Sequence, residues 1–436
     1  MLFVLWLLYS VSFLERYIVT MLVDPMKRDL GLSDLQMGLI LGPAFAVCYA
    51  AATIPFGWLA DRFSRRSVIF GGVTIWSIAT MGVGLARSFG ALFGVRIGVG
   101  LGEAALTPTA YSLVSDGFPR ERLTIAFAIF QTGVKFGSAA AFIVGGALLT
   151  YANSLGDISF GGFKLFPWQF VMLVAGAPGI VIAWLVFTFR EPARVTPIAV
   201  SADGLVPFLK SHRRLMTLMG LGFTFMSVCP SALSMWVPSF ILRNYGWSPV
   251  QYGTALGLIN ILAAVTVVFK GGLVDWLFAR GMADAHIRFY CWLLVIGIPI
   301  ACGAFFVPDA RLFLALYGVL QVIVIPYSFY ANATLSIVVP SHFRGRIFGT
   351  MLLMFSLVGG AIGPVIVGFL TDRVFGGPAN VGISLAVTLG FCMPAALICL
   401  VRVLGEVRCA VNEVDLAIQQ ELEVRMLGPL QERNVT

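Results

Sequence analysis

The chain has 436 residues and a net charge of +8; 59% of its residues are hydrophobic and only 11% are charged. Soluble proteins carry about 25% charged residues, and no globular surface could hide this many apolar side chains. The composition therefore excludes a soluble domain, a disordered chain, a coiled coil and a secreted disulfide scaffold, and no basic stripe points to a nucleic-acid partner.

Apolar runs follow one another along the chain, each bounded by charged or Pro- and Gly-rich residues. Each is near the roughly 20 residues that a membrane-spanning helix needs, so we predict twelve spans. They lie at about 2–22, 35–60, 67–87, 89–115, 123–150, 168–189, 215–240, 251–269, 287–306, 311–338, 346–370 and 381–403.

The spans divide into two groups of six. We predict an all-α membrane protein made of two pseudo-symmetric six-helix bundles, at residues 1–189 and 215–403. A cytoplasmic linker at 190–214 joins them, and a cytoplasmic tail occupies 404–436. Lys and Arg concentrate in the loops after even-numbered spans and in the tail, which places both termini in the cytoplasm. The first run lacks the basic leader and cleavage site of a signal peptide, so we interpret it as a retained span.

Enzyme chemistry and cofactors are not indicated. Seven cysteines are scattered with no CxxC pair, and all three histidines fall in predicted loops. The predicted spans contain no metal-ligand cluster and no nucleophile–base pair. We therefore expect neither a metal nor another cofactor, and no enzymatic activity.

A faint repeat relates the two halves. The loop after the second span reads GWLADRFSRR at residues 57–66, and the loop after the eighth reads GGLVD at 271–275. Internal repeats of this kind are typical of transporters built from two related bundles. We expect gating residues in these loops and at the inner end of the fourth span: Gly57, Asp61, Arg62, Arg65, Arg66, Asp116, Gly271, Asp275 and Arg280.

The segment at 57–66 resembles the G-x-x-x-D-R-x-x-R-R loop signature of the major facilitator superfamily, and the twelve-span layout extends the resemblance over nearly the whole chain. The resemblance implies the major facilitator fold and a loop that latches the two halves together when the protein is open to the outside. Arg62 and Asp116, at the cytoplasmic ends of two spans, are the expected latch pair.

Shorter segments resemble the Spinster-like branch, especially its bacterial members: LSDLQMG at 32–38, RIGVGLGEA at 96–104, PG at 178–179 and EP at 191–192. The branch usually carries an Asp-Arg pair in span 1, where this chain has Glu15-Arg16. The resemblance implies a multi-pass plasma membrane protein, in a bacterial inner membrane. It also implies proton coupling through Glu15, Arg96 and Glu103, and its animal members export lysolipids and sphingoid phosphates. The chain also resembles a second group, the symporters for sugar acids and other organic anions.

Away from the span ends, five charged residues lie within the predicted spans: Glu15, Arg16, Arg96, Glu103 and Lys135. Each costs at least a few kcal/mol at the bilayer centre unless it is paired or hydrated. With a rise of about 1.5 Å per residue, Glu15 lies at the same depth in the membrane as Arg96. By the same measure, Glu103 lies at the depth of Lys135. We therefore expect the pairs Glu15–Arg96 and Glu103–Lys135. Because buried ion pairs stabilise poorly, their presence favours function over structural pairing.

The excess of bases over acids in the first half favours an anionic group on the substrate. Away from the span ends, the second half shows no charge within its predicted spans and offers polar and aromatic side chains instead. This asymmetry suits an amphipathic substrate. The candidate substrate-binding residues are Arg16, Gln131, Lys135, Trp236, Asn260 and Tyr330.

The sequence thus predicts a secondary active transporter that works by alternating access, coupled to protons. It would move a small amphipathic or anionic organic solute such as a lysolipid- or sphingolipid-like molecule. Two alternatives stay open: a proton symporter for sugar acids or aromatic carboxylates, and a non-transporting receptor on the same fold, which would not need titratable groups in its core. The expected partners are the substrate, protons and membrane lipids, without nucleic acid, and we expect a monomer.

Overall fold

In the computed structural model the described residues are 1–119, 122–156, 158–160, 163–193, 205–324, 327–339 and 341–432. The first half comprises α1 (Leu2–Ile18), η1 (Val19–Leu22), α2 (Val23–Leu30), α3 (Asp34–Leu41), α4 (Pro43–Arg62), α5 (Arg65–Val83), α6 (Phe89–Glu103), α7 (Leu106–Gly117), α8 (Leu123–Ser154), β1 (Ile158–Phe160), β2 (Phe163–Leu165), α9 (Pro167–Ala183) and η3 (Trp184–Thr188). The strands β1 and β2 form an antiparallel hairpin.

The second half follows after the linker. It comprises α10 (Leu205–Ser211), α11 (Arg213–Tyr245), α12 (Pro249–Ala279), α13 (Ala285–Gly303), η4 (Ala304–Phe306), α14 (Ala310–Val324), α15 (Tyr327–Val338), α16 (Ser341–Met354), η5 (Phe355–Gly359), α17 (Gly360–Phe369), η6 (Leu370–Val374), η7 (Pro378–Asn380) and α18 (Val381–Glu432).

Within these described residues, twelve helical segments are long and apolar enough to cross a membrane, which confirms the predicted spans. Several spans consist of two consecutive helices: α3 and α4, for example, meet at Gly42-Pro43. Local signals fix the ends. A capping box of Ser33 and Gln36 begins α3, and Gly246 ends α11 with a φ of 66°, which glycine adopts without strain.

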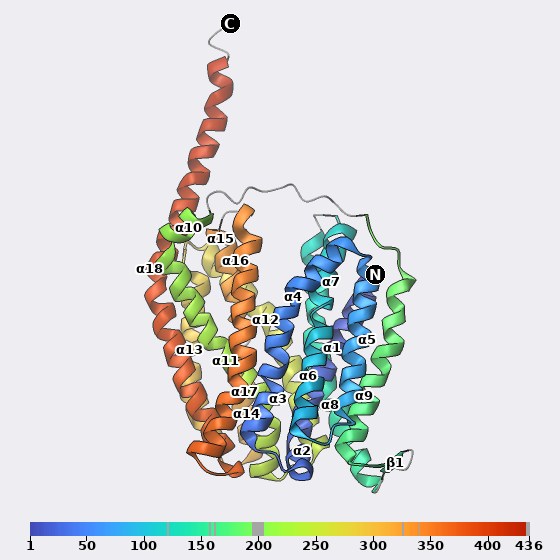
Figure 1. Ribbon diagram of the computed structural model, residues 1–436. Helices are drawn as coiled ribbons and strands as arrows, with labels where there is room; N and C mark the ends of the chain where they lie inside the picture. Colours follow the sequence, from blue (N-terminus) through green and yellow to red (C-terminus); the bar gives the residue numbers. More distant parts are fainter. Residues whose placement is uncertain are drawn as a thin grey trace.

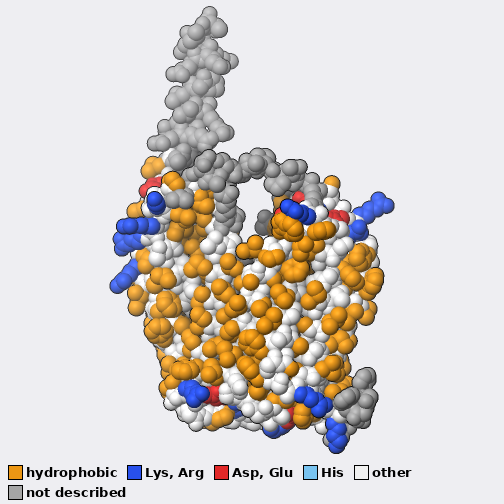
Figure 2. All heavy atoms as spheres, viewed as in Figure 1, with side chains coloured by type: hydrophobic (Ala, Val, Ile, Leu, Met, Phe, Trp, Pro, Cys, Tyr) orange, Lys and Arg blue, Asp and Glu red, His pale blue; other side chains and the backbone are white. Residues whose placement is uncertain are grey.

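The spans form two bundles that stand side by side (Figure 1). The described parts of the linker, after η3 and at α10, lie at one end of the molecule, and the β1–β2 hairpin lies at the other. We call these the linker end and the hairpin end. Hydrophobic side chains cover the sides of the molecule, whereas charged side chains gather at the two ends (Figure 2). Ile54, Val181 and Phe269 are each more than 70% exposed on these sides. Such an apolar belt fits a lipid bilayer, and the chain is an integral multi-pass membrane protein.

The bundles contact each other along two seams, α8 against α12 and α3 against α17. Glycine lets the backbones approach closely at both. A Cβ added at Gly253 would lie 2.3 Å from the Phe142 carbonyl oxygen, and one added at Gly38 would lie 2.6 Å from that of Pro364. Small residues are the usual means of close helix packing in membranes, because lipid supplies no hydrophobic driving force between helices.

Glycines in α6 serve the same purpose inside the first bundle. A Cβ at Gly100 would lie 2.6 Å from the Phe45 carbonyl oxygen, and one at Gly102 would lie 2.5 Å from the Trp76 nitrogen. These close contacts press α6 against α4 and α5. They also fix the position of the neighbouring Glu103 in the bundle interior.

Gly102→Ala should destabilise the first bundle by more than the roughly 1–3 kcal/mol typical of overpacking, because the clashing atoms belong to backbone and cannot turn aside. Thermal unfolding in detergent measures the loss. Gly94→Ala is the matched control on the same helix, because a Cβ there meets nothing within 4 Å. Equal unfolding midpoints for the two variants would contradict this reading of α6.

Candidate transport site

Glu103 is the centre of a charged cluster in the first bundle. It ends α6, and its side chain is only 1% exposed. Its Oε2 accepts a hydrogen bond from Ser12 at 2.8 Å and forms an ion pair with Arg16, both on α1. The Arg16 guanidinium also lies over the rings of Phe13 and Phe45, at 4.5 and 4.4 Å from their centroids. A cation held by a carboxylate and by aromatic faces is well placed to exist inside a bilayer.

Arg96 lies two helical turns before Glu103 on α6 and is equally buried. Its Nε and Nη2 meet no hydrogen-bond acceptor among the described residues. It is close enough to feel the charges of both Glu103 and Arg16. The cluster therefore holds one carboxylate within reach of two guanidinium groups, and the carboxylate pairs with only one of them.

Glu15 faces a different side of α1. Its carboxylate lies beside Thr80 and Trp76 of α5, and a Cβ at Gly179 of α9 would come within 2.9 Å of its Oε1. No cation among the described side chains pairs with it. The expected pairs Glu15–Arg96 and Glu103–Lys135 were wrong: Glu103 pairs with Arg16 instead. Depth along the membrane was the basis for both pairs, but neighbours on a helix differ by about 100° in direction.

A small cavity of about 50 Å³ lies between the bundles. Polar and aromatic side chains from both halves line it: Tyr17, Lys135 and Ser138 from the first half, and Ser234, Asn260, Tyr317 and Gln321 from the second. Lys135 and Asn260, two of the predicted substrate-binding residues, thus meet at one cavity. Gln131, one turn before the lysine, donates a hydrogen bond to the Tyr111 hydroxyl at 2.8 Å.

Two other predicted residues lie outside the lining of this cavity. Trp236 is fully buried and donates its Nε1 hydrogen to the Pro364 carbonyl at 3.0 Å, so it joins α11 to α17. Tyr330 is also fully buried and stacks on Tyr290 at 4.7 Å within the second bundle. Aromatic residues in apolar spans pack more often than they bind, and spacing alone could not separate the two roles.

Lys270 was missed in the sequence, where it stood just beyond the apolar run at 251–269. The structure continues α12 to Ala279, so this lysine lies within a span and is only 9% exposed. Its ammonium donates to the Val322 carbonyl of α14. The expectation that the second half carries no charge within its spans was therefore wrong. The signal was present: a lysine directly before the GGLVD repeat.

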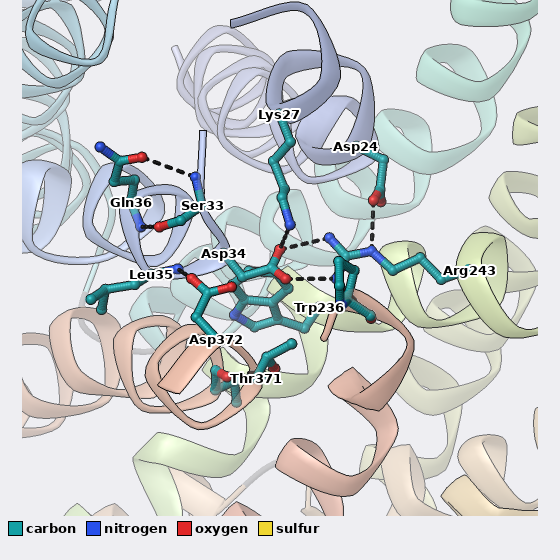
Figure 3. A network of polar contacts seen from close by, with 12 residues as sticks. Asp24, Lys27, Ser33, Asp34, Leu35, Gln36, Trp236, Arg243, Thr371 and Asp372 are labelled. Atoms are coloured by element: carbon teal, nitrogen blue, oxygen red, sulfur yellow. Dashed lines mark hydrogen bonds and ion pairs between the residues drawn. The ribbon is translucent and has the colours of Figure 1, made fainter. Parts of the chain in front are cut away.

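The hairpin end holds the two halves together through Arg243 of α11 (Figure 3). Its Nη2 and Nη1 lie 2.7 and 3.1 Å from the two carboxylate oxygens of Asp34, and its Nε lies 2.6 Å from Asp24. Lys27 contacts the same Asp34 at 2.5 Å. We call Asp24, Lys27, Asp34 and Arg243 the hairpin-end clamp. A two-pronged Arg–carboxylate pair combines strength with fixed geometry.

A second contact across the halves supports the clamp. The Asp372 carboxylate accepts a hydrogen bond from the Leu35 nitrogen at 2.6 Å, in the first turn of α3 (Figure 3). Negative charge is favourable at a helix N-terminus. All hydrogen bonds and ion pairs found between the two halves, in the parts of the chain that the structure describes, lie at this end. At the linker end a gap separates the lobes (Figure 2).

At the linker end, Arg65 is the centre of the 57–66 loop. It begins α5, is 1% exposed, and contacts Asp116 of α7 at 2.5 Å and Glu191 at 2.9 Å. In this conformation Asp116 pairs with Arg65 and not with Arg62; the latch pair Arg62–Asp116 was expected for the state open to the outside and stays a prediction. Arg62 ends α4 and lies over Trp58, one turn earlier, at 4.2 Å. The turn between α4 and α5 directs Arg65 inward instead.

The remaining predicted gating residues lie at the surface of this end or close to it. Asp61 is exposed, and Arg66 donates to the Phe189 carbonyl at 2.9 Å. In the second half, Asp275 lies 3.9 Å from His286 and Arg280 lies over Trp276 at 3.7 Å. A Cβ at Gly57 would meet nothing within 4 Å, and one at Gly271 only a Phe329 ring carbon at 3.4 Å. These contacts stay within one half, so any latch they form is not engaged here.

Comparison with known proteins agrees with this architecture. Residues 5–364 match the model of the Major Facilitator Superfamily. An MFS-type efflux pump of Mycolicibacterium smegmatis is 30% identical, over 85% of this chain and 84% of the relative. The D-galactonate transporter of Escherichia coli is 25% identical, over 84% of this chain and 87% of its own. A bacterial homologue of the human lysosomal transporter Spinster, solved in an inward-facing and unoccupied conformation, superposes with a TM-score of 0.76 at 26% identity, covering 94% of this chain and 96% of that one.

The chain therefore belongs to the major facilitator superfamily. Within it, the protein is a transporter of the Spinster type and not an enzyme.

Asp34→Asn should weaken the hairpin-end clamp, because removing one partner of a buried ion pair leaves the other charge uncompensated, at a cost of about 3–5 kcal/mol. We expect the halves to separate at this end. Spin labels at positions 28 and 373, both exposed and in opposite halves, measure the separation. Asp309→Asn is the control, because this acid lies at the same end but contacts only the start of its own helix. A distance distribution identical to that of the wild type would rule out the clamp.

Glu191→Gln tests the linker-end contacts. Partial burial alone would raise the pKa of Glu191, but hydrogen bonds from Arg65 and Ser64 and the Arg65 charge hold the pKa below its usual value. The ionised carboxylate therefore stabilises the fold at pH values above about 4.3, the ordinary pKa of a glutamate. This stability is lost as the pH falls through the lowered pKa of Glu191. The variant should unfold at lower temperature at pH 7, and its disadvantage should shrink in acid. Glu413→Gln, at an exposed position, is the control. If the unfolding temperatures of the Glu191 variant and the wild type differed by the same amount at every pH, the stabilising role of the Glu191 carboxylate would be contradicted.

Proposed function

We propose that the protein is a proton-coupled secondary active transporter that moves a small amphipathic or anionic organic solute by alternating access. The observation that carries the proposal is the position of Glu103, a buried carboxylate within reach of two guanidinium groups. Charges in the interior of a membrane protein are expensive, and they are kept mainly where transport needs them.

The proton step follows from this arrangement. While Glu103 is ionised it holds Arg16, and the cluster carries one negative charge against two positive ones. A proton on Glu103 removes that negative charge and releases the guanidinium. The released cation can then attract an anionic substrate, or a new partner in the opposite conformation. Glu15, which has no cation partner among the described residues, is a second carboxylate that can take up a proton.

Alternating access is supported by the unequal ends. The hairpin-end clamp closes one end, while the linker-end loop makes its contacts within the first half. If the linker is cytoplasmic, as the charge bias predicts, the gap between the lobes at the linker end faces the cytoplasm. Transport would require the clamp to open and the linker ends to approach each other, around a site near the membrane midplane.

The residues around the cavity between the bundles favour a class of substrate. Lys135 and the aromatic rings of Tyr17 and Tyr317 line one cavity, which suits a molecule with an anionic head and an apolar body. A lysolipid- or sphingolipid-like molecule has this character. The similarity to the D-galactonate transporter favours a second candidate, a proton symporter for sugar acids or related carboxylates.

Glu103→Gln should abolish accumulation driven by a pH gradient while leaving membrane insertion intact, because the amide keeps the shape but cannot carry the proton. Proteoliposomes loaded with a pH-sensitive dye measure proton flux upon addition of D-galactonate or of a lysophospholipid. Glu406→Gln, on the cytoplasmic part of α18, is the matched control and should behave as wild type. Unchanged accumulation by the Glu103 variant would remove this residue from the coupling mechanism.

A further inference from the structure

One aromatic ring in the first bundle lies against two guanidinium groups. The centroid of the Phe45 ring, on α4, lies 4.4 Å from the guanidinium carbon of Arg16 on α1 and 5.6 Å from that of Arg96 on α6. Both distances are within the roughly 6 Å over which a ring face attracts a cation. Phe45 is only 8% exposed, so little water screens either contact.

Close packing holds this ring in place. A Cβ added at Gly100 of α6 would lie 2.6 Å from the Phe45 carbonyl oxygen, so α6 and α4 approach by backbone at this residue. The ring also stacks on that of Tyr49, one turn later on α4, with 5.6 Å between the centroids. The Tyr49 hydroxyl in turn donates to Thr107 of α7 at 3.1 Å. Phe45 is therefore fixed at the point where both arginines reach it.

Arg96 depends on the ring because it has few other favourable contacts. It is buried, and its Nε and Nη2 meet no hydrogen-bond acceptor among the described residues. The acid two turns later on the same helix, Glu103, uses its Oε2 for Ser12 and Arg16. A guanidinium held in this way is costly in a bilayer, and an aromatic face offsets part of that cost without adding a negative charge.

The two charge states of Glu103 place different demands on Phe45. While Glu103 is ionised, its carboxylate holds Arg16, and the ring supports one unpaired guanidinium. When Glu103 is neutral, that ion pair is lost, and the ring faces two cations that no carboxylate offsets. A ring attracts a free cation more strongly than a paired one, because the opposite charges of a pair largely cancel at the ring. A ring at this position therefore favours the neutral state of Glu103.

Other titratable groups surround this cluster. Glu15 is the second acid, and its carboxylate faces α5 and α9 but is close enough to feel the charge of Glu103. Phenols ordinarily titrate only near pH 10, roughly, and so stay neutral in the physiological range. The phenols near the cluster are Tyr9 and Tyr17 of α1, Tyr49 of α4 and Tyr111 of α7. The charge that changes beside both arginines is therefore that of Glu103.

We propose that Phe45 is a positioning residue for proton coupling, whose ring keeps Arg16 and Arg96 beside Glu103 in both charge states of that acid. The proposal rests on the proton step proposed above and adds the residue that makes the step readily reversible. Without the ring, two unpaired cations would move apart whenever Glu103 is neutral. With the ring, loss of the proton restores the ion pair directly, because the Arg16 guanidinium has stayed in place.

Dipolar couplings measured by solid-state NMR test the positioning directly. The full chain in lipid bilayers would carry monofluorophenylalanine at position 45 and isotope-labelled guanidinium carbons, and Arg16→Lys and Arg96→Lys assign the two signals. The fluorine should couple to both guanidinium carbons in the otherwise wild-type protein. Both couplings should persist in Glu103→Gln, which imitates the neutral acid. Loss of the Arg16 coupling in Glu103→Gln would overturn the proposal.

Graded fluorination tests the contribution of the ring's charge. Fluorine withdraws electrons from the ring face with little change in size, so mono-, di- and trifluorophenylalanine at position 45 weaken its attraction for cations in steps. The infrared band of the Glu103 carboxylic acid, identified by its absence in Glu103→Gln, reports the charge state. Its titration midpoint should move to lower pH with each fluorine, by about tenfold in proton concentration for the trifluoro variant. The control is the same series at Phe130, a fully buried ring that stacks on Tyr9 and lies under no arginine in the described part of the chain.

Two infrared results would also overturn the role of Phe45: a trifluoro midpoint within about twofold of the wild-type proton concentration, or an equal shift when Phe130 is fluorinated. Either result would leave the proton step itself standing, because Glu103 would still titrate. A Glu103 band that does not titrate would instead refute the proton step. The NMR couplings need no titration and would then still decide whether Phe45 positions the two arginines.

Discussion

The cost of holding charge in a medium of low dielectric constant governs this structure. Lipid offers a buried ion no water, so each ionisable side chain must find a partner, reach a hydrated cavity or lose its charge. The first bundle solves the problem for Arg16 with Glu103 and two aromatic rings. It leaves Arg96 and Glu15 without ion partners among the described residues. In the proposed mechanism, these unbalanced groups are the ones on which a proton or an anion would act.

Close packing between helices fixes the positions of the charged groups within each bundle. Glycine at Gly102 and Gly100 fixes α6 against its neighbours, so the acid that ends the helix cannot drift. Glycine at the seams between the bundles lets the halves touch by backbone, with few side chains to reorganise when they move. The charged groups at the hairpin end then determine which end stays shut. Two rigid bundles whose polar contacts lie at their ends are suited to rotating relative to each other as rigid bodies.

Sequence patterns predicted the spans, the two-bundle layout, the family and the burial of the charged residues, because hydrophobic run length and the 57–66 signature are local properties. The partners of those charges were not predictable in the same way. Glu15 and Arg16 are adjacent in the chain yet face different helices, since direction around a helix changes with every residue. Arg243 and Asp34 are distant in sequence and meet only through tertiary packing. Lys270 was assigned to a loop because its charge ended the apolar run, although the helix continues past it.

The contact between Asp372 and the first turn of α3 lies where the hairpin end meets the aqueous medium. In the proposed transport cycle, opening of the hairpin end would take this carboxylate away from the start of α3, and the exposed backbone N–H groups would need water or dissolved anions as partners. The same opening separates Arg243 from its two acids. Dissolved salt screens such charges over roughly 8–10 Å at physiological concentrations, and it does so most strongly once water has entered. Under the proposed cycle, the ionic strength of the surroundings would be one of the variables that set how long the protein stays closed at the hairpin end.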